Sequence, residues 1–231
     1  MKVVGIIGGI GSGKSSVSSI FVKKGAPILD ADRAGHLTLQ ESYIKQKLLE
    51  RFGTAIFEHS IEKKNNVNNQ QQISEMGNDS AGIIEKNIDN YSINRKLLAD
   101  LVFASTEEAK KNLAFLNALI HPEIARKLEK QRQTFEARKK EFVILDAPLI
   151  LEAGWHKMAD YLIFVEAEEE TRWNRVRKRN WSRQEFKNRE AAQMPLSEKK
   201  KFADFVINNN QPWDQMVEQV ESLIKTIRQS N

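Results

Sequence analysis

The chain has 231 residues, which is enough for one large or two small domains with a sizeable core. Hydrophobic residues make up 40% and charged residues 29%, and there is no cysteine, which excludes a disulfide framework and a thiolate metal site. No apolar run reaches the roughly 18 residues that a membrane span needs, so we expect a cytoplasmic protein. The net charge of +5 suits an anionic ligand or nucleic acid without choosing between them.

The first thirty residues have the pattern of an α/β fold. Residues 2–7, KVVGII, are β-branched and bounded by glycine, which predicts a short buried strand. A glycine-rich loop follows, and then Val17, Ile20 and Phe21 recur at helical spacing before a possible C-cap at Gly25. A second short strand is predicted at residues 27–29. Strand, loop, helix and strand in this order open an α/β protein.

The glycine-rich loop, GGIGSGKS at residues 8–15, matches the P-loop pattern G-x-x-x-x-G-K-[ST]. Glycines let the backbone N–H groups approach a phosphate closely, and the following helix adds its free N-terminal amides. Lys14 then reaches the β- and γ-phosphates, and Ser15 offers its hydroxyl to Mg²⁺. An accidental glycine-rich turn is the alternative, but the flanking strand and helix favour binding of ATP with Mg²⁺. The residues predicted to contact the nucleotide are Gly8, Gly9, Ile10, Gly11, Ser12, Gly13, Lys14, Ser15 and Ser16.

The middle of the chain, from residue 37 to about 140, contains no convincing strand. Three segments have helical patterns: SYIKQKLLERF, NRKLLADLVF and the long stretch from KKNLAFLNALIHPEI onward. Between the first two lies a segment rich in Asn and Gln, at about residues 62–90. This segment contains no aromatic residue and is expected to bury little surface. We therefore interpret it as a flexible insertion.

Strand patterns return in the last third of the chain. EFVILDAPLILEAG and DYLIFVEA contain continuous apolar runs, as expected for parallel strands that are covered on both faces. KKKFADFVINNN contains a last short strand. The final helix is predicted to bury an amphipathic stripe. Its members are Trp213, Met216, Val217, Val220, Leu223, Ile224 and Ile227.

Two aspartates follow predicted strands and are candidate site residues. In an open parallel sheet, ligands bind beyond the carboxyl ends of the strands. Asp32, in DADRAGH, could accept the proton of an attacking hydroxyl, or it could simply cap the helix that follows. Asp146, in VILDAP, could hold Mg²⁺ directly or through water, or it could belong to a strand-end turn.

The segment TRWNRVRKRNWSR is strongly basic. Arg172, Arg175, Arg179 and Arg183 have offsets of 0, 3, 7 and 11, which would place them on one face of a single helix. Guanidinium groups suit phosphate oxygens, which favours a lid over the triphosphate. A solvated helix, or a nucleic-acid patch with Trp173 and Trp181 as stacking residues, remains the alternative.

Taken together, these motifs resemble the dephospho-coenzyme A kinase family. The resemblance is carried in order by GIIGGIGSGKSSV, ILDADRAGH, NRKLLADLVF, LNALIHPEI, DAPLILEAG, RWNRVRKRN and QMPLSEKKKFADFVINNN, which span nearly the whole chain. It implies transfer of the ATP γ-phosphate to the 3′-hydroxyl of dephospho-CoA. The departures are Ser16, where the family usually has Thr, and the long Asn- and Gln-rich segment.

The resemblance also implies roles for particular residues. Asp32 corresponds to the catalytic base, Arg95 to an arginine of the substrate-binding domain, and Arg175 and Arg179 to lid arginines that assist Lys14. His36 lies in a family motif and is grouped with Asp32 and Arg95 at the acceptor site without a chemical role. His121 lies in another motif, and a structural role is expected for it.

We therefore predict a P-loop kinase: a three-layer parallel sheet with a helical substrate-binding insertion and a basic helical lid. The nucleotide-binding core would comprise residues 1–38, 121–170 and 197–231, the acceptor domain 39–120, and the lid 171–196. The expected cofactors are ATP and Mg²⁺, and the expected partner is dephospho-CoA, with no nucleic acid or membrane and a monomer or weak oligomer. The alternatives are a kinase for a nucleoside or nucleotide, a GTPase, and a nucleic-acid-dependent ATPase. For the GTPase, DRAG at residues 32–35 fits D-x-x-G, but no N-K-x-D is present.

Overall fold

The computed structural model describes residues 1–59, 80–104, 106–179 and 181–229. The chain forms two compact units: residues 1–31 together with 127–231, and residues 32–126. The expected boundaries, near residues 38 and 121, lie a few residues from these divisions. None of the described helices has both the length and the apolar character that crossing a bilayer requires.

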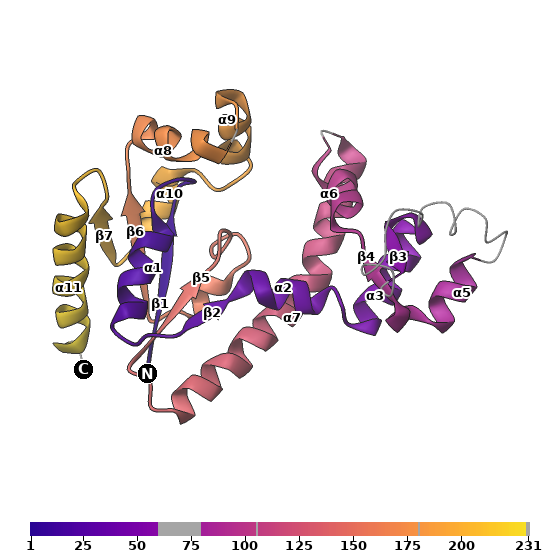
Figure 1. The fold of residues 1–231 in the computed structure, drawn as a ribbon, viewed down its shortest axis with the longest axis horizontal. Coiled ribbons are helices and arrows are strands. Elements are labelled where there is room, and N and C mark those ends of the chain that lie inside the picture. The colour runs from indigo at the N-terminus through magenta and orange to yellow at the C-terminus, as the bar shows by residue number, and fades with distance from the viewer. Residues whose placement is uncertain (60–79, 105, 180, 230–231) are drawn as a thin grey trace. The chain divides into compact units, whose positions relative to one another are not determined.

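A five-stranded parallel sheet forms the centre of the first unit, with strand order β2-β5-β1-β6-β7 (Figure 1). The strands are β1 (Lys2–Gly8), β2 (Ile28–Asp30), β5 (Phe142–Asp146), β6 (Tyr161–Glu166) and β7 (Phe205–Asn208). Val4 and Ile6 of β1 belong to an apolar cluster, and the alternate residues Val3 and Ile7 are buried as well. Both faces of β1 are therefore covered, as its apolar run predicts.

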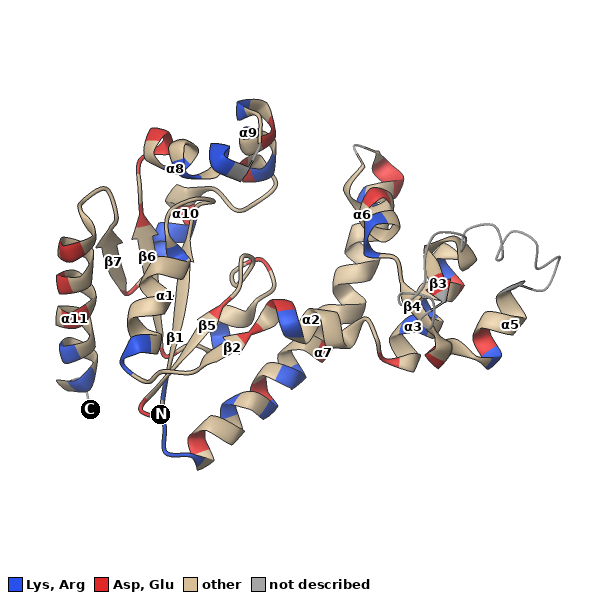
Figure 2. Ribbon diagram, viewed as in Figure 1, with Lys and Arg blue, Asp and Glu red and all other residues tan. Residues whose placement is uncertain are grey.

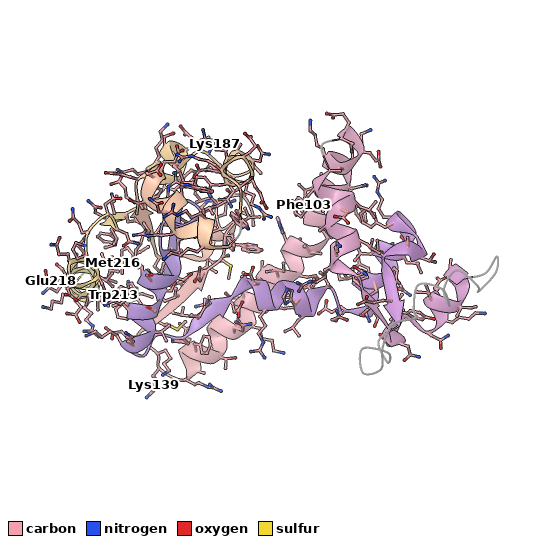
Figure 3. The ribbon with its side chains drawn as sticks, turned by 45° about the horizontal axis from the view of Figure 1, so that its top comes forward. Phe103, Lys139, Lys187, Trp213, Met216 and Glu218 are labelled. Carbon is pink, nitrogen blue, oxygen red and sulfur yellow. The ribbon has the colours of Figure 1, made fainter. Side chains whose placement is uncertain are left out.

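Helices α1 (Lys14–Lys23) and α11 (Trp213–Gln229) share this apolar cluster with the sheet. Met216, near the start of α11, is buried, whereas Trp213 and Glu218 are exposed (Figure 3). The predicted stripe on α11 is therefore confirmed except at Trp213. Trp213 is the first residue of the helix, and its indole lies against the ammonium group of Lys23 instead of entering the core.

The helices of the first unit that follow β5 or β6 are η5 (Trp155–Met158), α8 (Glu169–Val176), η6 (Arg177–Arg179), α9 (Arg183–Ala191) and α10 (Leu196–Lys201). The C-terminal part of α7 (Glu107–Ala137), which precedes β5, also belongs to this unit. Helices α8 and α9 lie beyond the carboxyl ends of β1 and β6 (Figure 1), and α10 packs against β1. The helices that follow β6 in the chain thus lie near the end of β1 where the glycine loop begins.

The second unit is mostly helical. It contains α2 (Ala31–Thr38), α3 (Ser42–Phe52), η1 (Thr54–Ile56), β3 (Phe57–His59), α5 (Ser80–Lys86), η4 (Ile88–Asn90), β4 (Tyr91–Ile93), α6 (Arg95–Phe103) and the N-terminal part of α7. Its core is a second apolar cluster that includes Ile44, Leu48, Ile56, Leu98 and Val102. The three predicted helical segments of this region are confirmed by α3, α6 and α7.

Two strands in the second unit contradict the expectation that residues 37–140 contain none. β3 and β4 pair in antiparallel fashion, with Phe57 opposite Ile93. Each strand has three residues, which is too short for a two-residue alternation to be read from the sequence. The pairing joins segments on either side of the Asn- and Gln-rich stretch, so only the tertiary fold creates these strands.

The predicted flexible insertion at residues 62–90 lies partly outside the described residues. Within its described part, α5 and η4 place Ile84 and Ile88 in the second apolar cluster, where they are 1% and 6% exposed. We expected this stretch to bury little surface, and for residues 80–90 that expectation was wrong. The reason is that Ile84 and Ile88, four positions apart, supply enough apolar surface to join the core of α3 and α6.

Candidate active site

The glycine loop has the backbone conformation that is typical of phosphate-binding loops. β1 ends at Gly8 and α1 begins at Lys14, so the loop passes directly from strand to helix. Gly8, Gly11 and Gly13 have φ angles of +147°, +75° and +97°, which side chains rarely allow. Gly13 is the N-cap of α1 and has no side chain that could cap the first turn of that helix. A helix N-terminus without a side-chain cap is suited to an anion.

Lys14 is held against the loop that it is predicted to serve. Its Nζ donates hydrogen bonds to the carbonyl oxygens of Gly8 and Gly9, at 3.1 and 3.0 Å. The pKa of Lys14 is lowered to about 8, chiefly by burial and also by the nearby cations Lys199 and Arg172, whereas Asp146 and Glu152 act in the opposite direction. An arriving phosphate would raise the pKa of Lys14 again, because a full negative charge stabilises the ammonium group more strongly than carbonyl dipoles do.

Arg172 supports the loop from outside. Its side chain is 4% exposed and forms an ion pair with Glu190 of α9. The same guanidinium donates to the carbonyl oxygens of Ala167, at 3.1 Å, and Ile10, at 3.4 Å. A buried guanidinium needs this many acceptors because an unpaired charge in the interior is costly. Arg172 thus joins α8, α9 and the glycine loop.

Arg175 and Asn209 hold the next part of the loop. Arg175 Nη1 donates to the carbonyl oxygens of Gly11 and Ser12, at 3.3 and 3.1 Å, and its Nη2 donates to Asn209 O at 2.8 Å. The amide Nδ2 of Asn209 donates to Ser12 O at 2.6 Å. Burial lowers the pKa of Arg175. The lid arginine predicted from sequence is therefore found beside the glycine loop, in contact with its carbonyl groups.

The predicted arrangement of four arginines on one helical face is wrong. Helix α8 ends at Val176, η6 follows, and α9 begins only at Arg183, with the hydroxyl of Ser182 accepting Glu185 N–H as its N-cap. Arg183 pairs with Glu169 and Glu170, which precede the basic run. Acidic and basic residues therefore both occur on α8 and on α9 (Figure 2). The side chain of Arg179 lies outside the described part of the chain.

The tryptophans of this segment are occupied by neighbouring side chains. Trp173 packs against Phe186 and lies under the guanidinium of Arg183. The centre of the Trp181 ring lies 4.3 Å from Cζ of Arg189. Rings that already stack on cations of their own chain are poor platforms for bases, so the structure disfavours the nucleic-acid interpretation.

Asp146 lies at the end of β5, between the ends of β1 and β2, with Ile6 and Asp30 as its register partners. One of its oxygens, Oδ2, accepts a hydrogen bond of 3.0 Å from the hydroxyl of Ser18. Ser15, the residue predicted to reach Mg²⁺, is exposed in the first turn of α1. The described residues contain no group of three or more His, Cys, Asp or Glu side chains that could hold a metal. One carboxylate and one hydroxyl fit Mg²⁺, which keeps several waters and takes phosphate oxygens as its other ligands.

The predicted acceptor residues lie in the second unit. Asp32 is the second residue of α2 and is exposed, so it occupies the first turn of the helix instead of its N-cap. His36 follows one turn later, and its Nε2 contacts Nη1 of Arg95. Arg95 begins α6, whose first turn is capped by the side chain of Asn94. The structure thus brings His36 and Arg95 together across 59 residues of sequence.

Comparison with known proteins supports one family. The family model described as Dephospho-CoA kinase matches residues 2–67 and 68–215. The chain belongs to the dephospho-CoA kinase family. A dephospho-CoA kinase of Dehalococcoides mccartyi is 32% identical over 97% of both chains, and that of Aquifex aeolicus is 31% identical over 98% of both. TT1252 from Thermus thermophilus has a similar solved structure, with a TM-score of 0.69 and 29% identity over 100% of this chain and 98% of that one.

A second solved structure, dephospho-CoA kinase from Campylobacter jejuni, has a TM-score of 0.58 at 23% identity, over 97% of this chain and 96% of that one, and shows the shared fold. The predicted P-loop kinase fold is therefore confirmed. From the sequence alone, Arg172 was expected to be one of the lid arginines, and no role was predicted for Glu190 or Asn209. Asn209 had a usable signal, because it directly follows the last parallel strand, in a family motif. Glu190 had none, since its partner Arg172 lies on another helix.

Proposed function

We propose that this protein transfers the γ-phosphoryl group of ATP to the 3′-hydroxyl of dephospho-CoA, the final step of coenzyme A biosynthesis. The observation that carries the proposal is the loop from Gly8 to Lys14, with its uncapped helix and half-buried lysine, in a chain that belongs to the dephospho-CoA kinase family. The loop supports binding of the triphosphate, and membership of the family supports dephospho-CoA as the acceptor.

The first unit would bind the nucleotide. The residues from Gly8 to Ser16 receive the phosphates on their N–H groups, and Lys14 exchanges its two carbonyl partners for phosphate oxygens. Arg175, already directed at the loop, and Arg179 would stabilise negative charge on the moving phosphoryl group. Bound Mg²⁺, held by Ser15 and Asp146, would shield the charge between the β- and γ-phosphates.

The second unit would present the acceptor. Arg95 and His36 bind dephospho-CoA, and the Asp32 carboxylate accepts the proton of the 3′-hydroxyl. The 3′-oxygen forms a bond to the γ-phosphorus while the bond from that phosphorus to the oxygen it shares with the β-phosphate breaks. ADP leaves with the electron pair of the broken bond, and the proton remains on Asp32 until solvent removes it.

An acceptor screen tests the proposal. ADP release would be measured with dephospho-CoA, nucleosides and nucleoside monophosphates, and the product identified by mass spectrometry. We expect phosphorylation of dephospho-CoA and loss of activity in Lys14→Met. Lys23→Met provides the matched control, because Lys23 is an exposed lysine at the other end of the same helix. Activity with a nucleoside and none with dephospho-CoA would refute the assignment.

The remaining alternatives are distinguished by the nucleotide and the partner. We propose a cytoplasmic monomer or weak oligomer that uses ATP and requires neither nucleic acid nor membrane. A GTPase would hydrolyse GTP without an acceptor, and a nucleic-acid-dependent ATPase would be stimulated by DNA or RNA in a salt-sensitive way. Size-exclusion chromatography with light scattering measures the oligomeric state.

A further inference from the structure

Lys199 is a buried lysine to which the proposed mechanism assigns no role. It lies on α10, its side chain is 2% exposed, and its Nζ is 3.0 Å from Glu152 Oε1 and 3.0 Å from Gln193 Oε1. Lysine is rarely buried to this extent, and removing its charge from water is costly even when it is paired. Burial of this group on a short helix therefore requires an explanation beyond stability.

Glu152 connects two segments that border the site. It belongs to the loop that follows Asp146 and β5, and besides pairing with Lys199 it accepts a 3.0 Å hydrogen bond from Met194 N–H. Although burial acts to raise the pKa of Glu152, the hydrogen bonds from Met194 N–H, its own backbone and Lys199 lower it, so this carboxylate is ionised. The segment from Gln193 to Lys199, which follows the lid helix α9, is thus tied to the loop behind Asp146.

The same segment also borders the glycine loop. Helix α10 packs against β1, and Leu196, Ser197 and Lys200 line a cavity of about 190 Å³ together with Gly9 and Arg172. Lys199 and Glu152 are also both within electrostatic reach of Lys14. The end of the lid, the loop after Asp146 and the glycine loop therefore meet around this ion pair.

We propose that Lys199 and Glu152 form a positioning pair for phosphoryl transfer, which holds the C-terminal end of the lid, residues 191–196, in register with the glycine loop. The inference rests on the proposed kinase activity. Ion pairs of this kind add little to folding stability, since apolar replacements are often neutral or stabilising. A positioning role predicts that its loss affects turnover more than stability, because small displacements of positioning groups slow catalysis by on the order of 10- to 100-fold.

The decisive variant is the double substitution Lys199→Met with Glu152→Gln, which removes both charges and keeps an acceptor for Met194 N–H. We expect an unchanged or higher melting temperature, a kcat reduced by on the order of 10- to 100-fold, and a KM for ATP within about threefold of the wild-type value. The single substitution Lys199→Arg should lower kcat less than the double substitution does, because arginine keeps the positive charge. Lys201→Met, which removes an exposed lysine paired with Glu198, is the control and should leave kcat unchanged.

Hydrogen exchange provides a readout that does not depend on turnover. ATP should protect residues 191–196 in the wild type and protect them less in the double variant. Wild-type kcat in a folded double variant, or a loss of kcat no larger than its loss of folded protein, would overturn the inference. If the wild type binds ATP but does not phosphorylate dephospho-CoA, the proposed function fails, and the exchange experiment still decides whether the pair positions the lid.

Discussion

Gly13 offers a sharp test of how the glycine loop is built. A Cβ at this position would lie 2.0 Å from Asn209 Nδ2, and the φ of +97° is unfavourable for any side chain. Gly25 has a nearly equal φ of +92° but no atom within 4 Å of its Cβ position. The substitutions Gly13→Ala and Gly25→Ala therefore share backbone strain and differ in the clash with Asn209.

The magnitudes follow from these two terms. Left-handed backbone costs an alanine about 1–2 kcal/mol, and we expect this loss of stability for Gly25→Ala. Gly13→Ala also displaces Asn209, which is 6% exposed and donates to Ser12 O, so a further ~1–3 kcal/mol is expected from the broken buried hydrogen bond. The total for Gly13→Ala is about 2–5 kcal/mol, where each 1 kcal/mol lowers the melting temperature by roughly 2–4 °C.

Calorimetry and ATP titration would measure both effects. We expect the affinity for ATP to fall by at least about tenfold (~1.4 kcal/mol) in Gly13→Ala and to stay within about twofold of wild type in Gly25→Ala. Adding Asn209→Ala to Gly13→Ala removes the obstacle, so the double variant should lose less stability than the sum of the single losses. Equal losses of stability and of ATP affinity in the two glycine variants would refute the reasoning.

Three further predictions concern the chemistry and the lid. With a Lys14 pKa of about 8, Lys14 is charged below that pH and neutral above it, so kcat/KM for ATP should fall as the pH rises through about 8; a profile flat to well above that pH would contradict this. Asp32→Asn should lower kcat by on the order of 10²- to 10⁴-fold with unchanged ATP affinity by calorimetry, and normal turnover would remove Asp32 from the mechanism. Arg172→Met leaves Glu190 without its buried partner. Because Glu190 is one-quarter exposed, we expect the free energy of unfolding to fall by only about 2–3 kcal/mol, as measured by thermal unfolding. Adding Glu190→Gln to the same chain should restore part of this stability, and no restoration would contradict the pairing.

Local patterns in the sequence were enough to predict the nucleotide-binding half of the fold. The apolar runs of β1, β5 and β6 are continuous because both faces of these strands are buried, and the loop from Gly8 to Ser15 needs glycine and lysine at fixed spacings. Such features depend on neighbours in the chain. They are visible before any tertiary structure is known.

Long-range contacts decided the rest. β3 and β4 exist because they pair across the Asn- and Gln-rich segment, and Ile84 and Ile88 are buried because α3 and α6 lie beside them. The basic segment 171–183 was predicted as one helix, but Arg172, Arg175 and Arg183 take partners on α9, the glycine loop and the start of α8. A charged side chain is positioned by whichever partner satisfies it, and that partner is brought near by the fold and not by spacing in the sequence.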